Sequence, residues 1–159
     1  MSERGTRLMA KADGQLAEIT EFFGTLDETD LRKSCPDESA EHSAGDTVGT
    51  VAAHMAEGYR HLGWFLRATG YVPGPPSTGN NHGHEHSRAP DVLPDMRDRL
   101  AGGKVPIRLL ADLTDEQLDS VPPASSSRFS DGRRTLEQVI DAAIAHQAAH
   151  LATLRRALA

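Results

Sequence analysis

The chain has 159 residues, with 17 lysines and arginines against 23 aspartates and glutamates, and a formal net charge of -6. This length suits one compact domain over 1–159, and the acidic balance argues against nucleic acid as a partner, because phosphate binding needs a basic surface. Aromatic residues make up only 4% of the chain while alanine and leucine are plentiful, which favours helices over a β-sandwich or barrel.

Nothing in the sequence indicates export or a membrane. The lone cysteine, Cys35, cannot form an internal disulfide. The opening residues MSERGTRLMAKADG lack the apolar run of a signal peptide, and no stretch is long and apolar enough to span a bilayer. We therefore expect a soluble cytoplasmic protein with no membrane partner.

The first part of the chain predicts two helices separated by a polar connection. An imperfect apolar stripe predicts a helix over about 3–25, and the polar segment 26–44 follows it. Asp46 is a suitable N-cap for a second helix over about 46–69. Gly70 is well placed to end this helix, because glycine readily adopts the left-handed conformation that follows a helix.

A long irregular segment, 70–90, comes next, with the sequence GYVPGPPSTGNNHGHEHSRAP. Its prolines and glycines exclude a continuous helix, and a loop of this length in a small domain is usually a functional lid or a flexible stretch. A third helix is predicted from about Asp91. Gly102, Gly103 and Pro106 should break it before its apolar pattern resumes.

The last predicted helix begins after a second polar connection. Thr135 and Gln138 form a capping-box pattern, T-L-E-Q, and the helix is expected to run almost to the end of the chain. Four helices of this length predict an all-α four-helix bundle. The long connections leave its topology open to something other than a simple up-and-down order.

A faint internal repeat relates the two halves of the chain. Three residues recur 87 positions later: Leu26, Leu31 and Gly45 match Leu113, Leu118 and Gly132. Each set precedes a helix that carries candidate ligands. Two helix pairs related by an approximate two-fold axis would explain the repeat, and so would chance in a leucine-rich chain.

His146 and His150, in AIAHQAAHLATLRRAL, are the strongest metal-ligand candidates. Residues four apart lie on one helical face, and this face also carries core-type residues, so few groups are at hand to satisfy the ring nitrogens. A shared metal ion is one solution, and hydrogen bonds to neighbouring polar groups are the other. The glutamate of the H-E-x-x-H motif is absent, which disfavours that class of zinc peptidase.

His54, at the edge of the apolar face of the second predicted helix, is a third candidate ligand. Alone, such a residue is more often a satisfied core histidine. Opposite His146 and His150 it would complete a three-histidine site with an open coordination position, which is the arrangement of catalytic metal sites. His61 competes with His54 for this role, and Glu57 is a candidate to orient a ligand by a hydrogen bond.

His82, His84 and His86, in NHGHEHS, form a separate group. Alternating histidines can bind copper or nickel, although a solvated polar loop with incidental histidines is the simpler interpretation. If the loop folded over the bundle, one of these residues would reach the site as an acid or base.

The sequence resembles the DinB-like superfamily. The residues that carry the resemblance are the histidine within TVGTVAAHMAEGYRHL, the HxxxH within TLEQVIDAAIAHQAAHLATLR, and the segments LDETDL and LTDEQL. The likeness covers most of the chain from about Leu26, without the loop over 70–90. It implies a four-helix bundle that holds a divalent metal, zinc or alternatively nickel, through His54, His146 and His150.

The resemblance also implies an enzymatic activity. The family includes transferases that use low-molecular-weight thiols such as mycothiol, and mycothiol-dependent maleylpyruvate isomerase has a related domain. A thiol and a small-molecule electrophile are therefore the implied partners, and a homodimer is the implied assembly. The chain departs from the family in its histidine-rich loop and its interrupted third helix, near the place where a substrate would enter.

Three functions are compatible with such a site. In a transferase or isomerase, a thiol bound at the open metal position would lose its proton and attack an electrophile. In a hydrolase, the same position would activate water. In a non-catalytic protein, the histidine-rich segment 80–87 would bind a metal or a toxic small molecule. Histidine suits zinc, nickel, copper and iron alike, so the residues alone do not choose the metal.

Overall fold

The computed structural model describes residues 2–35, 46–74 and 93–159. Within these ranges every regular element is a helix, apart from one isolated bridge between Ser34 and Thr47, so the prediction of an all-α chain is confirmed. None of the helices in the described ranges is both long enough and apolar enough to cross a bilayer.

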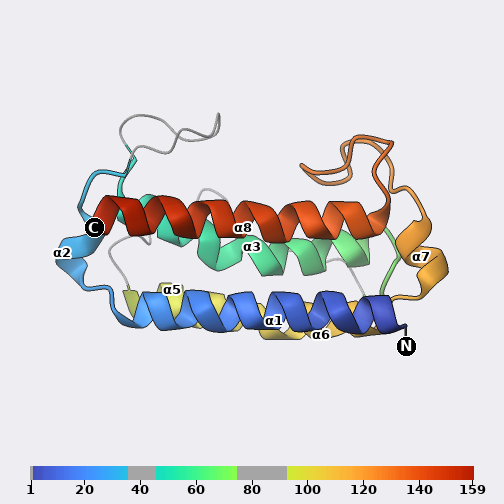
Figure 1. The fold of residues 1–159 in the computed structure, drawn as a ribbon, viewed down its shortest axis with the longest axis horizontal. Coiled ribbons are helices and arrows are strands. Elements are labelled where there is room, and N and C mark those ends of the chain that lie inside the picture. The colour runs from blue at the N-terminus through green and yellow to red at the C-terminus, as the bar shows by residue number, and fades with distance from the viewer. Residues whose placement is uncertain (1, 36–45, 75–92) are drawn as a thin grey trace.

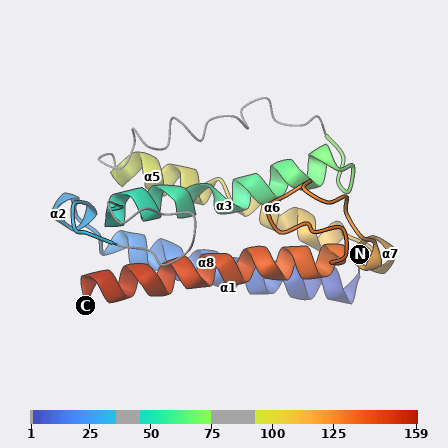
Figure 2. The same cartoon turned by 90° about the horizontal axis from the view of Figure 1, so that it is seen from above.

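Three long helices and one broken helical row lie side by side (Figures 1 and 2). The long helices are α1 (Glu3–Gly24), α3 (Val48–Ala68) and α8 (Leu136–Leu158), and the row consists of α5 (Leu93–Ala101), α6 (Lys104–Leu109) and the 3-10 helix η1 (Leu110–Asp112). Helices α1 and α3 each pack against both α8 and the broken row. The core lies between these four units and includes Ile19, Phe23, Met55, Leu66, Met96, Ile107 and Ile140.

Helix α3 begins one residue later than the sequence indicated. Its N-cap is Thr47, whose hydroxyl accepts a hydrogen bond from the Thr50 amide at 3.2 Å, so the prediction of Asp46 as the cap is wrong. The reason is non-local, because the Asp46 carbonyl accepts a hydrogen bond from the Cys35 amide at 2.9 Å and keeps this residue in the extended pairing before the helix. Gly70 follows the helix with φ +79°, as predicted.

The third predicted helix is interrupted where its glycines stand. Helix α5 ends before Gly102 and Gly103, and a Cβ on Gly103 would come within 2.9 Å of the Tyr59 side chain in α3. Pro106 lies in the first turn of α6, where its missing amide hydrogen leaves no intrahelical bond unmade. It packs against Gly63, so the break lets the row approach α3 closely.

Two short helices support the internal repeat. Helix α2 (Glu28–Leu31) and helix α7 (Asp115–Asp119) each begin with a capping box, and the N-cap of α7 stands 87 positions after that of α2. They lie at opposite ends of the molecule (Figure 1). This placement agrees with two helix pairs related by an approximate two-fold axis.

Candidate metal centre

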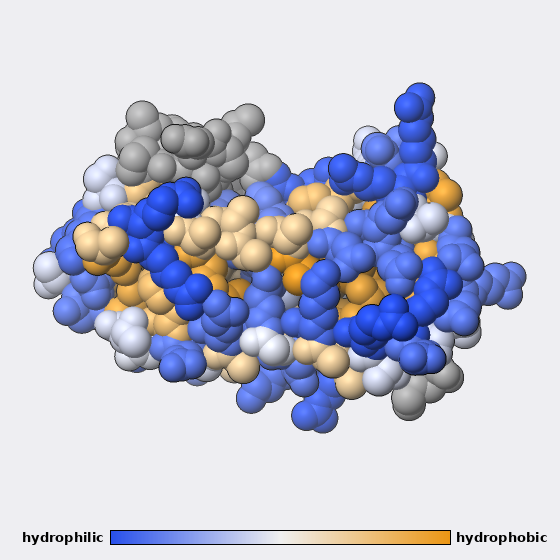
Figure 3. Space-filling model, viewed as in Figure 1, coloured by the Kyte–Doolittle hydropathy of each residue, from blue (hydrophilic) through white to orange (hydrophobic). Residues whose placement is uncertain are grey.

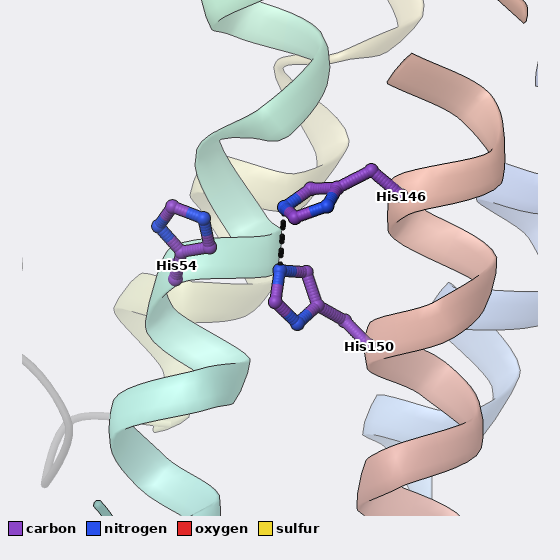
Figure 4. A group of neighbouring side chains, drawn as sticks. All are labelled: His54, His146 and His150. Carbon is purple, nitrogen blue, oxygen red and sulfur yellow. Dashed lines mark hydrogen bonds between the residues drawn. The ribbon is translucent and has the colours of Figure 1, made fainter. Parts of the chain in front are cut away.

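Three predicted ligands meet between α3 and α8. His54 comes from α3, and the imidazoles of His146 and His150 project from α8 towards it (Figure 4). Each residue offers one ring nitrogen, and these nitrogens lie within 4.8 Å of one another. His150 is 2% exposed, while His54 and His146 are partly exposed. Among the described residues, this group contains His54 and does not contain His61.

A hydrogen bond joins the two histidines of α8. Their Nε2 atoms are 2.8 Å apart, and the guanidinium of Arg128 places its Nη1 3.4 Å from the same nitrogen of His146. A guanidinium can only donate, so Nε2 of His146 is the acceptor in its contact with Arg128, and its single lone pair is directed at these hydrogen-bond donors. A metal ion on these nitrogens would take the place of the hydrogen bond between the two histidines, because a ligating imidazole nitrogen carries no proton.

The donor set fits one divalent ion. A tetrahedral ion about 2.0–2.1 Å from each nitrogen holds its ligand atoms about 3.3 Å apart. The nitrogens of His146 and His150 are closer than this, at 2.8 Å, so binding requires them to separate by about half an ångström. Three neutral imidazoles on such an ion would leave a fourth position open.

A buried glutamine holds the two helices in register at the level of the histidines. The side-chain amide of Gln147, which is 4% exposed, donates a hydrogen bond of 2.9 Å to the carbonyl of Met55. Gly58 makes this possible, because a Cβ there would overlap the Gln147 amide. Since Met55 and Gln147 directly follow His54 and His146, this contact fixes how the ligands face each other.

A cavity of about 320 Å³ adjoins the histidines. This volume lies at the lower end of the range of small-molecule pockets, about 300–1,000 Å³. Its walls are mostly apolar and come from α3, α8 and the loop before α8. They include Trp64, Phe65, Arg128, Phe129, Val139 and Ala143. His54 and His146 form part of the lining, so the candidate metal centre opens into this space.

The loop over 120–134, which the sequence indicated only as a polar connection, covers one side of the cavity. The Ser125 amide bonds to the Ser130 carbonyl at 2.9 Å, and Asp131 accepts hydrogen bonds from two following amides. The loop places the ring of Phe129 5.4 Å from that of His146, centroid to centroid. Apolar surface reaches the upper edge of the molecule beside this loop (Figure 3). In the sequence, the one indication that this loop lines a cavity is Phe129, an aromatic residue within a run of serines.

The remaining candidates occupy different places. Glu57 is 3% exposed, and its carboxylate accepts hydrogen bonds from Arg60 at 3.0 Å and Arg99 at 3.1 Å. His61 lines the cavity. Desolvation lowers the pKa of its imidazole, the charge of Glu57 raises it, and the charge of Arg60 lowers it. His82, His84 and His86 lie outside the described residues.

No family model, curated protein or solved structure matches the chain. The likeness to the DinB-like superfamily accordingly rests on the motifs and on the residues themselves.

Proposed function

We propose that this chain is a metal-dependent transferase or isomerase of the DinB-like superfamily, with its four helical units forming the bundle of that family. The observation that carries the proposal is the convergence of His54, His146 and His150 at the wall of a mostly apolar cavity. A closed structural site would have no use for such a cavity, whereas a catalytic site needs space for a substrate beside an open coordination position.

The ion would supply the activation. A divalent cation, zinc first and nickel as the alternative, would lower the pKa of a low-molecular-weight thiol such as mycothiol at the open position. The chain has no need of a nucleophile of its own, and its lone cysteine is unsuited to that role because Cys35 is 0% exposed.

The protein's residues would orient the reactants and exclude water. The three histidines hold the ion, and the bond from Gln147 to Met55 keeps their helices in register. The apolar walls formed by Phe65, Phe129 and Val139 receive the electrophile and limit hydration around the thiol. A homodimer is the assembly that the family resemblance suggests.

The proposal is tested by following free thiol in the presence of a chlorinated aromatic electrophile. Attack forms a carbon–sulfur bond and releases chloride, and the thiol proton goes to solvent. We expect zinc-loaded parent protein to consume mycothiol and release chloride together, and both metal-free parent and His150→Ala protein to do neither above the uncatalysed rate.

Two results would contradict the proposal. Equal thiol consumption by parent and His150→Ala protein would remove the histidines from the reaction. Turnover of ester or amide substrates without any thiol, lost in His150→Ala, would replace the transferase with a hydrolase at the same site.

A further inference from the structure

The cavity beside the histidines holds most of the aromatic side chains of the protein. The sequence contains only one tryptophan, two tyrosines and four phenylalanines among its 159 residues. The cavity lining consists of 15 residues, yet four of these seven aromatic residues belong to it: Tyr59, Trp64, Phe65 and Phe129. Aromatic side chains are therefore scarce in the chain and concentrated at the cavity.

The core between the helices is packed differently. It is built mostly from leucine, isoleucine, valine, methionine and alanine side chains. Such aliphatic residues fill space and exclude water as well as rings do, so a hydrophobic interior does not by itself require aromatic residues. An aromatic ring adds a face and an edge of opposite partial charge, which attract another ring in stacked or edge-to-face geometry.

Three of the four rings are restrained by contacts of their own. The Tyr59 hydroxyl donates a hydrogen bond to a glutamine of α1. The ring centroid of Phe65 lies 6.4 Å from that of Tyr71, and the centroid of Phe129 lies 5.4 Å from that of His146. Because these contacts already restrain the rings, little side-chain freedom remains to be lost when a ligand binds.

The rings also leave aromatic surface for a ligand to cover. Tyr59 and Phe65 are each 3% exposed, whereas Trp64 and Phe129 are partly exposed. Apolar surface that stays in contact with water gains free energy when a ligand covers it. A flat ligand ring is the body that best matches such surface, because it adds ring-to-ring contacts to the burial.

We propose that this cavity binds the aromatic ring of its ligand, so that the electrophile at the histidine site carries an aryl group. This names the class of electrophile for the site described above and therefore rests on the proposed function. Since His54 and His146 belong to the same lining, a ring bound here lies next to the metal centre. The volume of about 320 Å³ suits a single ring with a short side chain.

Two neutral alcohols that differ only in their ring test the inference: 2-phenylethanol and its saturated counterpart 2-cyclohexylethanol. The saturated compound has the larger apolar surface, so burial alone would favour it. We expect zinc-treated protein to bind 2-phenylethanol at least about fivefold more tightly, because contacts between aromatic rings add to the burial. Binding is followed by the fluorescence of Trp64, the single tryptophan, which lines the cavity.

Phe129→Leu removes one ring of the lining and keeps an apolar side chain. We expect the preference for 2-phenylethanol to fall at least about twofold, while 2-cyclohexylethanol binds within about twofold of its affinity for the parent. Phe22→Leu is the matched control, because Phe22 is a partly buried aromatic residue of α1 outside the lining, and it should keep the preference. Equal or tighter binding of 2-cyclohexylethanol to the parent, or an unchanged preference in Phe129→Leu, would overturn the inference.

Metal content and thiol consumption, measured on the same samples, separate this inference from the proposed function. Parent protein that binds zinc and consumes thiol, but does not prefer the aromatic alcohol, would refute the aromatic site and leave the proposed function standing. Parent protein that shows the preference and binds no zinc would refute the metal centre and keep the aromatic site.

Discussion

Helix α3 carries two polar clusters less than one turn apart, and they are built on opposite principles. On one side, Glu57 is surrounded by the guanidiniums of Arg60 and Arg99, so opposite charges neutralise each other. In the second cluster, His54 faces His146 and His150, so that three imidazoles are gathered at a cavity. The first arrangement ties α5 to α3, and the second offers three lone-pair donors to a cation.

The two clusters should differ in what is lost when they are changed. A buried carboxylate with two cationic partners is satisfied by the protein alone, so its removal should be felt in folding. A cluster of imidazoles gains most from a ligand that the chain does not contain. Changes in the first cluster should therefore lower the free energy of unfolding and leave metal binding intact. Changes in the second cluster should weaken metal binding and leave the free energy of unfolding nearly unchanged.

The largest effect on stability is expected from Glu57→Gln. It leaves two guanidiniums facing a neutral amide, and because both arginines are partly exposed we expect a loss of about 2–3 kcal/mol in the free energy of unfolding, below the range for fully buried pairs. Urea unfolding measures it. Asp95→Asn is the control, since Asp95 is a half-exposed partner of Arg99 and should cost less than about 1 kcal/mol. Equal losses in the two variants would show that the buried carboxylate of Glu57 contributes no more to stability than the half-exposed carboxylate of Asp95.

The substitution Gly58→Ala should lower both the free energy of unfolding and the affinity for zinc. The added methyl group displaces the Gln147 amide, which we expect to lower stability by about 1–3 kcal/mol and to weaken zinc binding as well, because the register of His54 and His146 is disturbed. Calorimetric zinc titration and urea unfolding measure the two effects.

Gly14→Ala supplies the matched control of opposite sign. Gly14 lies within α1 with open space around it, so alanine should stabilise the protein by about 0.5–1 kcal/mol and leave zinc affinity unchanged. A Gly58→Ala protein that also gains stability would show that Gln147 does not need the space.

The smallest effect is expected from His61→Gln, in the pH dependence of stability. The pKa of His61 is lowered from 6.5 in the folded protein, chiefly by desolvation, so the unfolded chain binds more protons than the folded one just below this pH. Stability should therefore fall as the pH drops from 6.5 towards the lowered pKa. Urea unfolding of metal-free protein at pH 7.5 and 5.5 should show a shallower fall in His61→Gln, and identical falls would exclude this contribution.

Local signals predicted most of the fold. The capping box at Thr135, the stop at Gly70 and the apolar stripes place α1, α3 and α8 to within about two residues, because caps and periodicity act within a helical turn. The HxxxH spacing also predicted that His146 and His150 share a face.

What the sequence did not show depends on contacts between distant segments. The cap of α3 shifted because Cys35 bonds to Asp46 across the bridge. Arg99 reaches Glu57 from 42 positions away, and the role of Gln147 depends on a carbonyl in another helix. The approach of Arg128 to His146 requires the whole loop over 120–134 to fold back over α8, and no periodic pattern encodes such a turn.

The central claim is that His54, His146 and His150 hold one ion, and metal stoichiometry tests it most directly. Parent, His54→Ala and His150→Ala proteins are loaded with zinc, passed over a desalting column and measured by mass spectrometry. We expect about one zinc per chain in the parent and a loss from both variants, since each removes one of three ligands. Zinc retained at the same stoichiometry in both variants, or no zinc in the parent, would contradict the three-histidine centre.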